Sequence, residues 1–392
     1  VAVLTSLVSI AIITAVAMLW LASTALQWMT ALASVKILFT MMARVYVVQL
    51  RRSSNFRMLA SRTLLGKVSG GVAGISAALL GLGAWAVIAQ ALIMEFVSIL
   101  VLMLGDRRRI PWVIDGPFLR ELLTAGLPVA VNTLSSQTLQ RGVNVILGIT
   151  AGTHAVGMLN LAMRIIDLPR TAFYNGLMSY ALPALARRSA EPSRLIGFIF
   201  DSTAISCFLL TPIFIGIAVT ADDIVLLIFG AKWADSIPLL QVLACTAAIG
   251  NTAMYATTAL VAVNRTHLTL KAEVGTTLLA LALVYGLGSL YGGMAAALAL
   301  LLRMLIVTPL QIRGLNTAIG SGWRAFFTSS YRSVTASLVM AAAVLWLAPL
   351  LQVQGVVHLA CSIGIGALTY ALAYSLLHPR WPQEFKSVFT TR

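Results

Sequence analysis

Charged residues are scarce in this chain of 392 residues, where Asp, Glu, Lys and Arg together make up only 10%. A soluble globular domain is about 25% charged, so a soluble fold of this length is excluded. Hydrophobic residues make up 59% of the chain, and its mean hydropathy is +0.94. This composition is typical of a helical protein that crosses a membrane many times.

Cysteine is rare, and the common catalytic motifs are missing. The three cysteines, Cys207, Cys245 and Cys361, lie far apart in apolar segments, without a CxxC or Cys-His spacing. We interpret them as small buried apolar residues and expect no zinc or redox site. The sequence also has no P-loop, dinucleotide-binding glycine pattern, nucleophile elbow or HExxH motif. We therefore expect no cofactor, no metal and no enzymatic or ATP-driven activity.

Hydrophobic segments of about 20 residues, the length needed to cross a bilayer, recur along the whole chain. We predict an all-α fold with about twelve transmembrane helices. The expected spans are about 1–22, 28–49, 68–84, 86–104, 122–149, 156–185, 196–218, 236–262, 273–290, 294–312, 333–351 and 357–377.

Basic residues are divided unevenly between the two sets of connecting loops. Of the 27 Lys and Arg residues, 20 fall in loops on one side, Lys232 alone falls on the other, and six fall inside spans. Short cytoplasmic loops of membrane proteins are rich in Lys and Arg. We therefore expect a multi-pass protein of the bacterial inner membrane, with both ends of this chain cytoplasmic. The same distribution argues against a nucleic-acid partner, despite the net charge of +15.

The longest loops on the basic side divide the chain into parts. We expect an N-terminal lobe of four spans at 1–104, a cytoplasmic linker at 105–121 and a C-terminal lobe of six spans at 122–312. Residues 313–332 are expected to lie at the membrane interface, and 333–392 to form a last pair of spans with a cytoplasmic tail. Because the chain opens inside a span at Val1, we expect further sequence before it.

The fifth and sixth spans carry polar residues that match in depth across one tight turn near Gly152. Counted outward from that turn, the matched pairs are Asn144 with Asn160, Arg141 with Arg164, and Gln137 with Asp167. On each helix these residues are three or four positions apart, so each set forms one stripe. The arginine layer is expected roughly 15 Å from the turn, near the middle of the bilayer.

Two interpretations of this stripe are open. Guanidinium groups bind phosphate bidentately and stay charged, so Arg141 and Arg164 are candidate ligands of an anionic cargo. Alternatively, Asp167 pairs with Arg164 or Arg170 and only holds two helices together. A bare charge in lipid costs roughly 2.5–3.5 kcal/mol, and two arginines beside one acid leave surplus positive charge. We therefore favour a cationic cavity.

Further charged residues inside spans include two possible partners and two more candidate ligands. Lys36 and Glu95, near the middle of the second and fourth spans, are interpreted as an ion pair. Arg44 is close enough to the cytoplasmic end to reach the interface. Arg303 needs a cavity or a partner at its depth. Both arginines are kept as candidate cargo ligands.

Small residues four positions apart occur as Gly70 with Gly74 and as Gly148 with Gly152. This spacing lets two helices approach closely in a membrane. We interpret both pairs as packing sites and not as hinges.

Several short motifs in order resemble the polysaccharide transporter (oligosaccharide flippase) family of the multidrug/oligosaccharidyl-lipid/polysaccharide exporter superfamily. The motifs are LRRSSNFR at 50–57, GGVAGISAALLGLGAWA at 70–86, LNLAMR at 159–164 with LP at 168–169 and LPAL at 182–185, and FGAKW at 229–233. Leu159 stands where the family usually has an aromatic residue. The resemblance implies a two-lobed exporter of fourteen spans, of which four, six and two are present here and the first two are missing.

The resemblance implies a transporter that flips an isoprenoid-diphosphate-linked oligosaccharide for surface polysaccharide synthesis. Arg141 and Arg164 would hold the diphosphate in a central cationic cavity. Sugar hydroxyls would be bound by Asn132, Gln137, Asn144 and Asn160. The expected partners are the lipid-linked oligosaccharide, membrane lipid, and the polymerase and chain-length machinery of polysaccharide synthesis.

Three alternatives remain. A cation-coupled multidrug exporter of the same superfamily predicts an acidic cavity, whereas the residues here are basic. A membrane polysaccharide polymerase or ligase predicts a large catalytic loop, which the short outer loops do not provide. A non-functional fragment is the third alternative, because a lobe of four spans leaves the cavity open on one side.

Overall fold

The computed structural model describes residues 2–20, 23–53, 55–105, 116–188, 192–263, 265, 267–320, 323–351 and 355–378. The side chains of 116–136 and 174–195 and of a few residues at helix ends are outside this description, as are most of the expected 105–121 linker and the tail after residue 378. All regular elements in the described ranges are α-helices or short 3-10 helices. The all-α prediction is confirmed.

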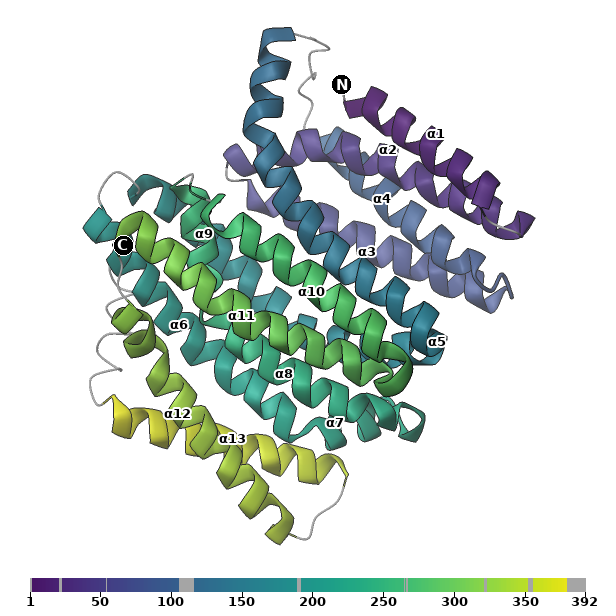
Figure 1. The fold of residues 1–392 in the computed structure, drawn as a ribbon. Coiled ribbons are helices and arrows are strands. Elements are labelled where there is room, and N and C mark those ends of the chain that lie inside the picture. The colour runs from purple at the N-terminus through teal and green to yellow at the C-terminus, as the bar shows by residue number, and fades with distance from the viewer. Residues whose placement is uncertain are drawn as a thin grey trace. The chain divides into compact units, whose positions relative to one another are not determined.

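Contacts divide the chain into two units, Val1–Glu121 and Leu122–Arg392. The first unit contains α1 (Ala2–Trp20), α2 (Thr24–Arg52), α3 (Phe56–Leu79) and α4 (Trp85–Gly105), shown from purple to blue in Figure 1. Helices α3 and α4 form a hairpin whose turn contains Gly81 and Gly83. Both glycines have positive φ angles, 76° and 52°, which residues with a Cβ rarely adopt. Helix α2 packs against α1 and α4.

A stripe of glycines on α3 lies directly against α4. A Cβ added at Gly66 would come within 2.3 Å of Ser98 Oγ, and one at Gly70 within 2.8 Å of Met94 Cβ and 2.9 Å of the Gln90 carbonyl. A Cβ at Gly74 would meet Gln90 Cβ at 2.9 Å. The expected packing role of Gly70 and Gly74 is confirmed, because no larger residue fits this contact.

The variant Gly70→Leu is expected to destabilise the first unit. Overpacking a tight contact costs typically about 1–3 kcal/mol, and here one clashing atom belongs to the backbone. The measurement is the thermal midpoint of the purified chain in detergent. Gly71→Leu is the matched control, since an added Cβ there meets no atom within 4 Å. Equal midpoints for the two variants would contradict the prediction.

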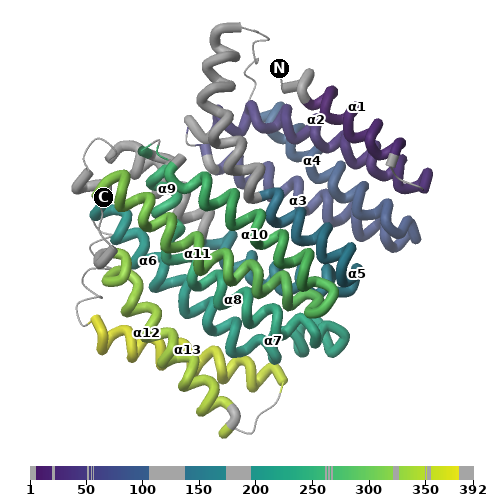
Figure 2. The backbone as a smooth tube through the Cα atoms, in the orientation of Figure 1, coloured from purple at the N-terminus to yellow at the C-terminus, as the bar shows by residue number. Residues whose placement is uncertain are grey.

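The second unit is built from one long hairpin and a series of helices that pack on it. The helices are α5 (Gly116–Arg188), α6 (Pro192–Val219), α7 (Ala221–Ile228), α8 (Ile237–Asn251), α9 (Met254–Ala262), α10 (His267–Tyr291), α11 (Gly293–Ile319), α12 (Trp323–Leu347) and α13 (Val356–Leu377). Figure 2 follows this path from teal to yellow. Short 3-10 helices lie at Ala231–Ser236 and Ala348–Leu351.

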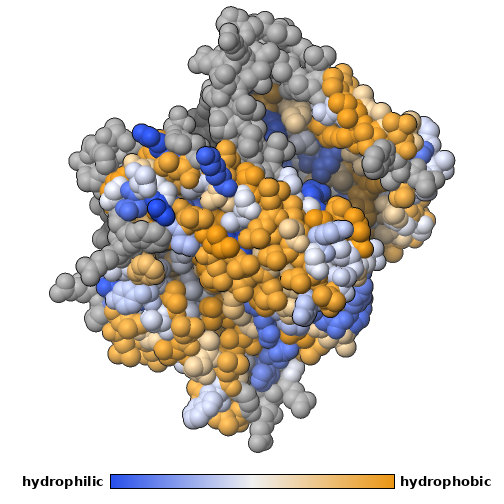
Figure 3. All heavy atoms as spheres, viewed as in Figure 1, coloured by the Kyte–Doolittle hydropathy of each residue, from blue (hydrophilic) through white to orange (hydrophobic). Residues whose placement is uncertain are grey.

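The core of the second unit gathers around α5. Leu147 and Leu159 of α5 are fully buried, together with Leu210 of α6, Leu240 of α8 and Val284 of α10. Large apolar side chains also cover the outside, and the face seen in Figure 3 is mostly apolar over α10 and α11. An apolar outside around an apolar core is what a bilayer requires of a helical protein.

Nine segments of the described residues are long and apolar enough to cross a membrane. The described apolar stretch of α1, Ser6–Leu19, is shorter than 18 residues, α3 is not among the nine, and the fifth and sixth expected spans are counted together as Gln137–Phe173 although Gly152 interrupts them. The chain is therefore a multi-pass membrane protein, and the count of twelve stays a prediction.

Two details differ from expectation. The eighth expected span, 236–262, is broken between α8 and α9 after Asn251, whose buried amide donates to the Ser206 carbonyl at 3.1 Å. Of the cysteines, Cys207 is buried, whereas Cys361 is half-buried and Cys245 is exposed. The segment 313–332 belongs largely to the end of α11 and the start of α12, and its place at the membrane interface stays a prediction.

Candidate functional site

The polar hairpin expected around Gly152 is present within α5. Gly152 interrupts the helix with φ 83° and ψ 174°, and the two arms on either side of it are helical. Asn144 Nδ2 donates to Asn160 Oδ1 at 3.4 Å, so the two amides expected at equal depth do meet. Gly152 itself forms the turn, and an added Cβ at Gly148 would make only an ordinary contact, at 3.7 Å. The expected packing role of Gly148 with Gly152 is therefore wrong.

Each arm buries one face and leaves the other open. Leu139, Val143 and Leu147 of the first arm and Leu159 and Ala162 of the second belong to the core. The expected site residues lie on the remaining faces: Gln137, Arg141, Arg164 and Asp167 are exposed, and Asn144 and Asn160 are half-buried. Packing of the apolar faces thus directs this polar set away from the core.

Asp167, the acid of the same hairpin, does not neutralise the two arginines in the described structure. In the part of the chain whose side chains are described, no ion pair joins Asp167 to Arg164 or Arg170, and none involves Arg141. Arg141 lies one helical turn before Asn144, and Arg164 lies one turn after Asn160. Each arginine is therefore one turn farther from Gly152 than the bonded amide on its own arm. Two guanidinium groups can offer up to ten N–H donors to an anion.

Arg44 and Asn132 are two further candidate ligands. Arg44 is exposed on α2, in the first unit, and no described residue pairs with it. Asn132 lies in α5, but its side chain is outside the described residues. Of the candidate ligands, the structure shows one pair in contact, Asn144 with Asn160 of the hairpin.

Arg303 has a partner that the sequence did not suggest. Its Nη2 lies 2.5 Å from Glu273 Oε2, and Gln311 Nε2 donates to Glu273 Oε1 at 2.6 Å. The Arg303 and Glu273 side chains are only 13% and 15% exposed. Arg303 is thus half of a mostly buried ion pair between α10 and α11, which makes it a poor ligand for a cargo.

The expected ion pair of Lys36 and Glu95 is not formed. Both side chains are half-buried, on α2 and α4, yet no hydrogen bond or ion pair joins them in the described part of the first unit. The Lys36 ammonium is left beside a groove between α1 and α2.

A polar contact joins α13 to the short helix α7. His358 Nδ1 lies 2.8 Å from Asp223 Oδ2, and the two side chains are 27% and 26% exposed. Both side chains are half-buried and partly open to solvent, and we interpret the contact as a local link between one end of α13 and α7.

Structures with a similar fold are transporters and flippases. A structure of the lipid II flippase MurJ, in its inward closed conformation, matches 91% of this chain and 75% of its own length, with a TM-score of 0.69 and 15% identity. An outward-facing multidrug resistance transporter of the MATE family and MOP superfamily matches 82% of this chain and 78% of its own, with a TM-score of 0.64 and 15% identity. The chain therefore has the fold of this superfamily of exporters.

Two relatives by sequence have names from polysaccharide synthesis. The succinoglycan biosynthesis transport protein ExoT of Rhizobium meliloti (strain 1021) is 23% identical over 198 residues, which is 50% of this chain and 40% of ExoT. The teichuronic acid biosynthesis protein TuaB of Bacillus subtilis (strain 168) is 30% identical over 115 residues, 28% of this chain and 24% of TuaB. The matches thus span less than half the length of either relative.

The family model described as polysaccharide biosynthesis protein matches residues 1–238, more than half of this chain. The matched region contains all of the first unit, the polar hairpin of α5 and the FGAKW segment at 229–233. This agrees with the family that the sequence motifs resemble. The chain belongs to the polysaccharide biosynthesis protein family.

Proposed function

We propose that this protein flips an isoprenoid-diphosphate-linked oligosaccharide across the bacterial inner membrane for surface polysaccharide synthesis. The observation that carries the proposal is the pair of arginines, Arg141 and Arg164, on the open faces of a membrane-embedded hairpin without an acidic partner in the described residues. Such groups are costly in lipid and are expected to line a polar path. An anionic diphosphate is the part of this cargo that they would bind.

The amide groups of the hairpin supply a second kind of contact. Asn144 and Asn160 use one donor and one acceptor on each other, and each side chain keeps further donor and acceptor positions. Gln137, one turn before Arg141, is exposed. Sugar hydroxyls both donate and accept, so these amides would bind the head group next to the diphosphate.

The names of the relatives support the same class of cargo. ExoT and TuaB are named for the synthesis of surface polysaccharides, and MurJ is named as a flippase of lipid II. In this proposal the lipid tail stays in the bilayer while the head crosses. Both ends of this chain would face the cytoplasm, and the polymerase and chain-length machinery would take over the cargo on the other side.

A transport assay separates this function from drug export. The full chain is reconstituted in liposomes that contain a fluorescent isoprenoid-diphosphate oligosaccharide, and the label that reaches the outer leaflet is measured by chemical quenching. A cationic dye in parallel liposomes reports drug transport. We expect flipping of the lipid-linked sugar and no transport of the dye, because the guanidinium groups repel a cation. Dye transport without flipping would replace the proposal with the multidrug exporter.

The membrane potential is expected to drive the transport. One elementary charge gains about 2.3 kcal/mol per 100 mV, so a dianionic head that leaves a negative compartment gains roughly 4–5 kcal/mol when no ion moves with it. Flipping is measured in the same liposomes under potassium diffusion potentials of either sign. We expect the potential that is negative on the starting side to accelerate flipping several-fold. Equal rates under both signs would exclude electrogenic transport and leave Asp167 as a candidate for ion coupling.

A further inference from the structure

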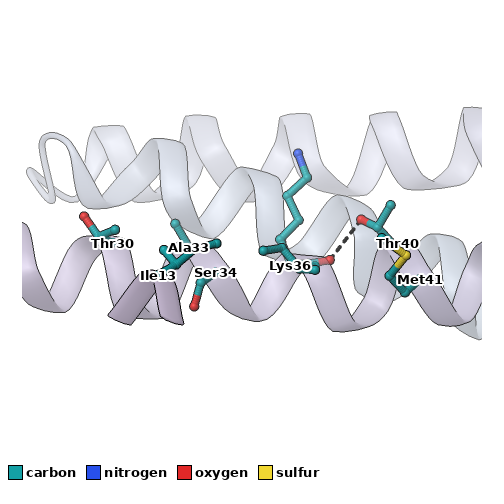
Figure 4. Close-up of a pocket in the computed structure, with 8 residues that line it drawn as sticks. Ile13, Thr30, Ala33, Ser34, Lys36, Thr40 and Met41 are labelled. Atoms are coloured by element: carbon teal, nitrogen blue, oxygen red, sulfur yellow. Dashed lines mark hydrogen bonds between the residues drawn. The ribbon is translucent and has the colours of Figure 1, made fainter. Parts of the chain in front are cut away.

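An open groove of about 350 Å³ lies between α1 and α2 of the first unit. This volume is within the range of small-ligand sites, roughly 300–1,000 Å³. Ile13 of α1 and Ala33, Ile37 and Met41 of α2 give the groove apolar walls. Figure 4 shows that Lys36 extends from α2 with its amine away from the helix backbone.

The hydroxyl groups around the groove donate their hydrogens to backbone carbonyls of α2. Thr30 Oγ1 donates to the Leu26 carbonyl at 2.8 Å, and Ser34 Oγ donates to the Ala31 carbonyl at 2.6 Å. Thr40 Oγ1 donates to the carbonyl of Lys36 at 2.9 Å, the dashed line in Figure 4. Among the side chains of this groove, the Lys36 ammonium alone therefore keeps free donors, three in number.

Lys36 lies far from both ends of its span. It is near the centre of the membrane segment Thr24–Leu50, and at a rise of 1.5 Å per residue it is about 18 Å or more from either end. Its side chain is half-buried, and no described residue pairs with the ammonium. A cation at this depth is expensive unless an anion or a polar cavity meets it.

We propose that this groove binds an anionic amphiphile, a phosphate head on a flexible apolar chain, with the phosphate on Lys36. The chain would lie along Ile13, Ala33, Ile37 and Met41, which offer apolar contact and no polar group. An ammonium is a compact point charge with three donors, and it needs no second basic group to hold one phosphate. A carbohydrate does not fit, because the groove offers no further donors for its hydroxyl oxygens. A free phosphate would leave the apolar walls unused.

The site is separate from the arginine hairpin, and its test measures affinity and not transport. The full chain is purified in nanodiscs of zwitterionic lipid, and binding of decyl phosphate is followed by phosphorus NMR. Inorganic phosphate and decyl maltoside are the head-only and neutral-chain competitors. We expect decyl phosphate to bind at least tenfold more tightly than either. Displacement by phosphatidylglycerol would identify a resident membrane lipid as the natural source, and displacement only by an isoprenoid phosphate would identify a carrier lipid; both support the site.

Two variants test the charge and the apolar groove separately. Lys36→Met keeps a straight side chain and removes the charge, and it should weaken decyl phosphate binding about tenfold or more. Ala33→Phe keeps the charge and fills the groove, and it should weaken binding in the same way. Lys67→Met is the matched control, because Lys67 is an exposed lysine of the same unit outside the groove.

Wild-type affinity in both variants, with an unchanged elution profile on size exclusion, would overturn the proposal. Equal binding of inorganic phosphate would also overturn it, because the site would then select a free anion. Equal binding of decyl maltoside would do the same, because the groove would then be only an apolar surface.

Discussion

The double variant Arg141→Ala/Arg164→Ala is expected to lose at least 99% of lipid-linked oligosaccharide flipping at normal protein levels. A hydrogen bond to a charged group contributes about 1.5–3 kcal/mol, and each 1.4 kcal/mol is a factor of ten. Losing one such bond at each arginine therefore costs about a hundredfold or more. Both side chains lie outside the core, so the fold should tolerate the change.

Matched variants on the same hairpin separate charge, geometry and position. Arg170→Ala removes an exposed charge from the same arm, six residues beyond Arg164 and thus on another side of the helix, and it should keep normal flipping. Arg141→Lys/Arg164→Lys keeps both charges but loses the planar fork, so its rate should lie between those of the wild type and the alanine variant. Normal flipping by the alanine variant would retain the transporter and discard this site.

The α5 hairpin could be predicted because its signal is local. A glycine turn and two helices fix which residues share a depth, and Asn144 and Asn160, expected at equal depth, are found bonded to each other. The periodicity of 3.6 residues also indicates which face is apolar, and that face is the one in the core. Local rules of this kind need no knowledge of the other helices.

The sequence did not predict which side chains on different helices contact each other, because equal depth in the membrane does not determine such contacts. Lys36 and Glu95 both lie near the middle of a span, but equal depth does not determine the direction in which a side chain points, and the two do not pair. Arg303 reaches Glu273 with a long side chain from a different depth, whereas Gln311 and Glu273 stand at equal separations from the turn at Gly292. That equal spacing was the available signal for Glu273.

The break between α8 and α9 was missed for a related reason. No proline marks it, and the hydrophobic pattern continues through it. The buried amide of Asn251 bonds to the backbone of α6, and Ser206 of α6 donates to the Tyr255 hydroxyl at 3.0 Å. Contacts of this kind arise only after the helices have packed, so no local pattern predicts them.

Replacing Glu273 with alanine is expected to destabilise the second unit by about 3–5 kcal/mol. The reason is the uncompensated charge: Arg303 is only 13% exposed, and its Nε already lacks a hydrogen-bond partner among the described residues. Removing one member of a buried pair typically costs this much, because the other charge remains away from water. The measurement is reversible unfolding of the reconstituted chain, followed by tryptophan fluorescence.

The double variant Glu273→Leu/Arg303→Met tests that explanation. Apolar residues of similar volume often replace a buried ion pair at little cost, so the double variant should be much more stable than Glu273→Ala. A double-mutant cycle with the two single changes gives the coupling energy, which should be clearly favourable. A Glu273→Ala variant as stable as the wild type would show that the pair contributes nothing.

The same double variant decides what Arg303 does in transport. Arg303 was a candidate cargo ligand because a cation at its depth needs a partner, and Glu273 supplies that partner at 2.5 Å. When the pair serves only to join α10 and α11, a stable Glu273→Leu/Arg303→Met chain should flip its cargo at nearly the wild-type rate. A stable double variant that fails to flip would instead mean that Arg303 leaves Glu273 for the cargo during the transport cycle. The anionic path would then extend from the α5 hairpin to α11, with Glu273 competing with the diphosphate for the same guanidinium group.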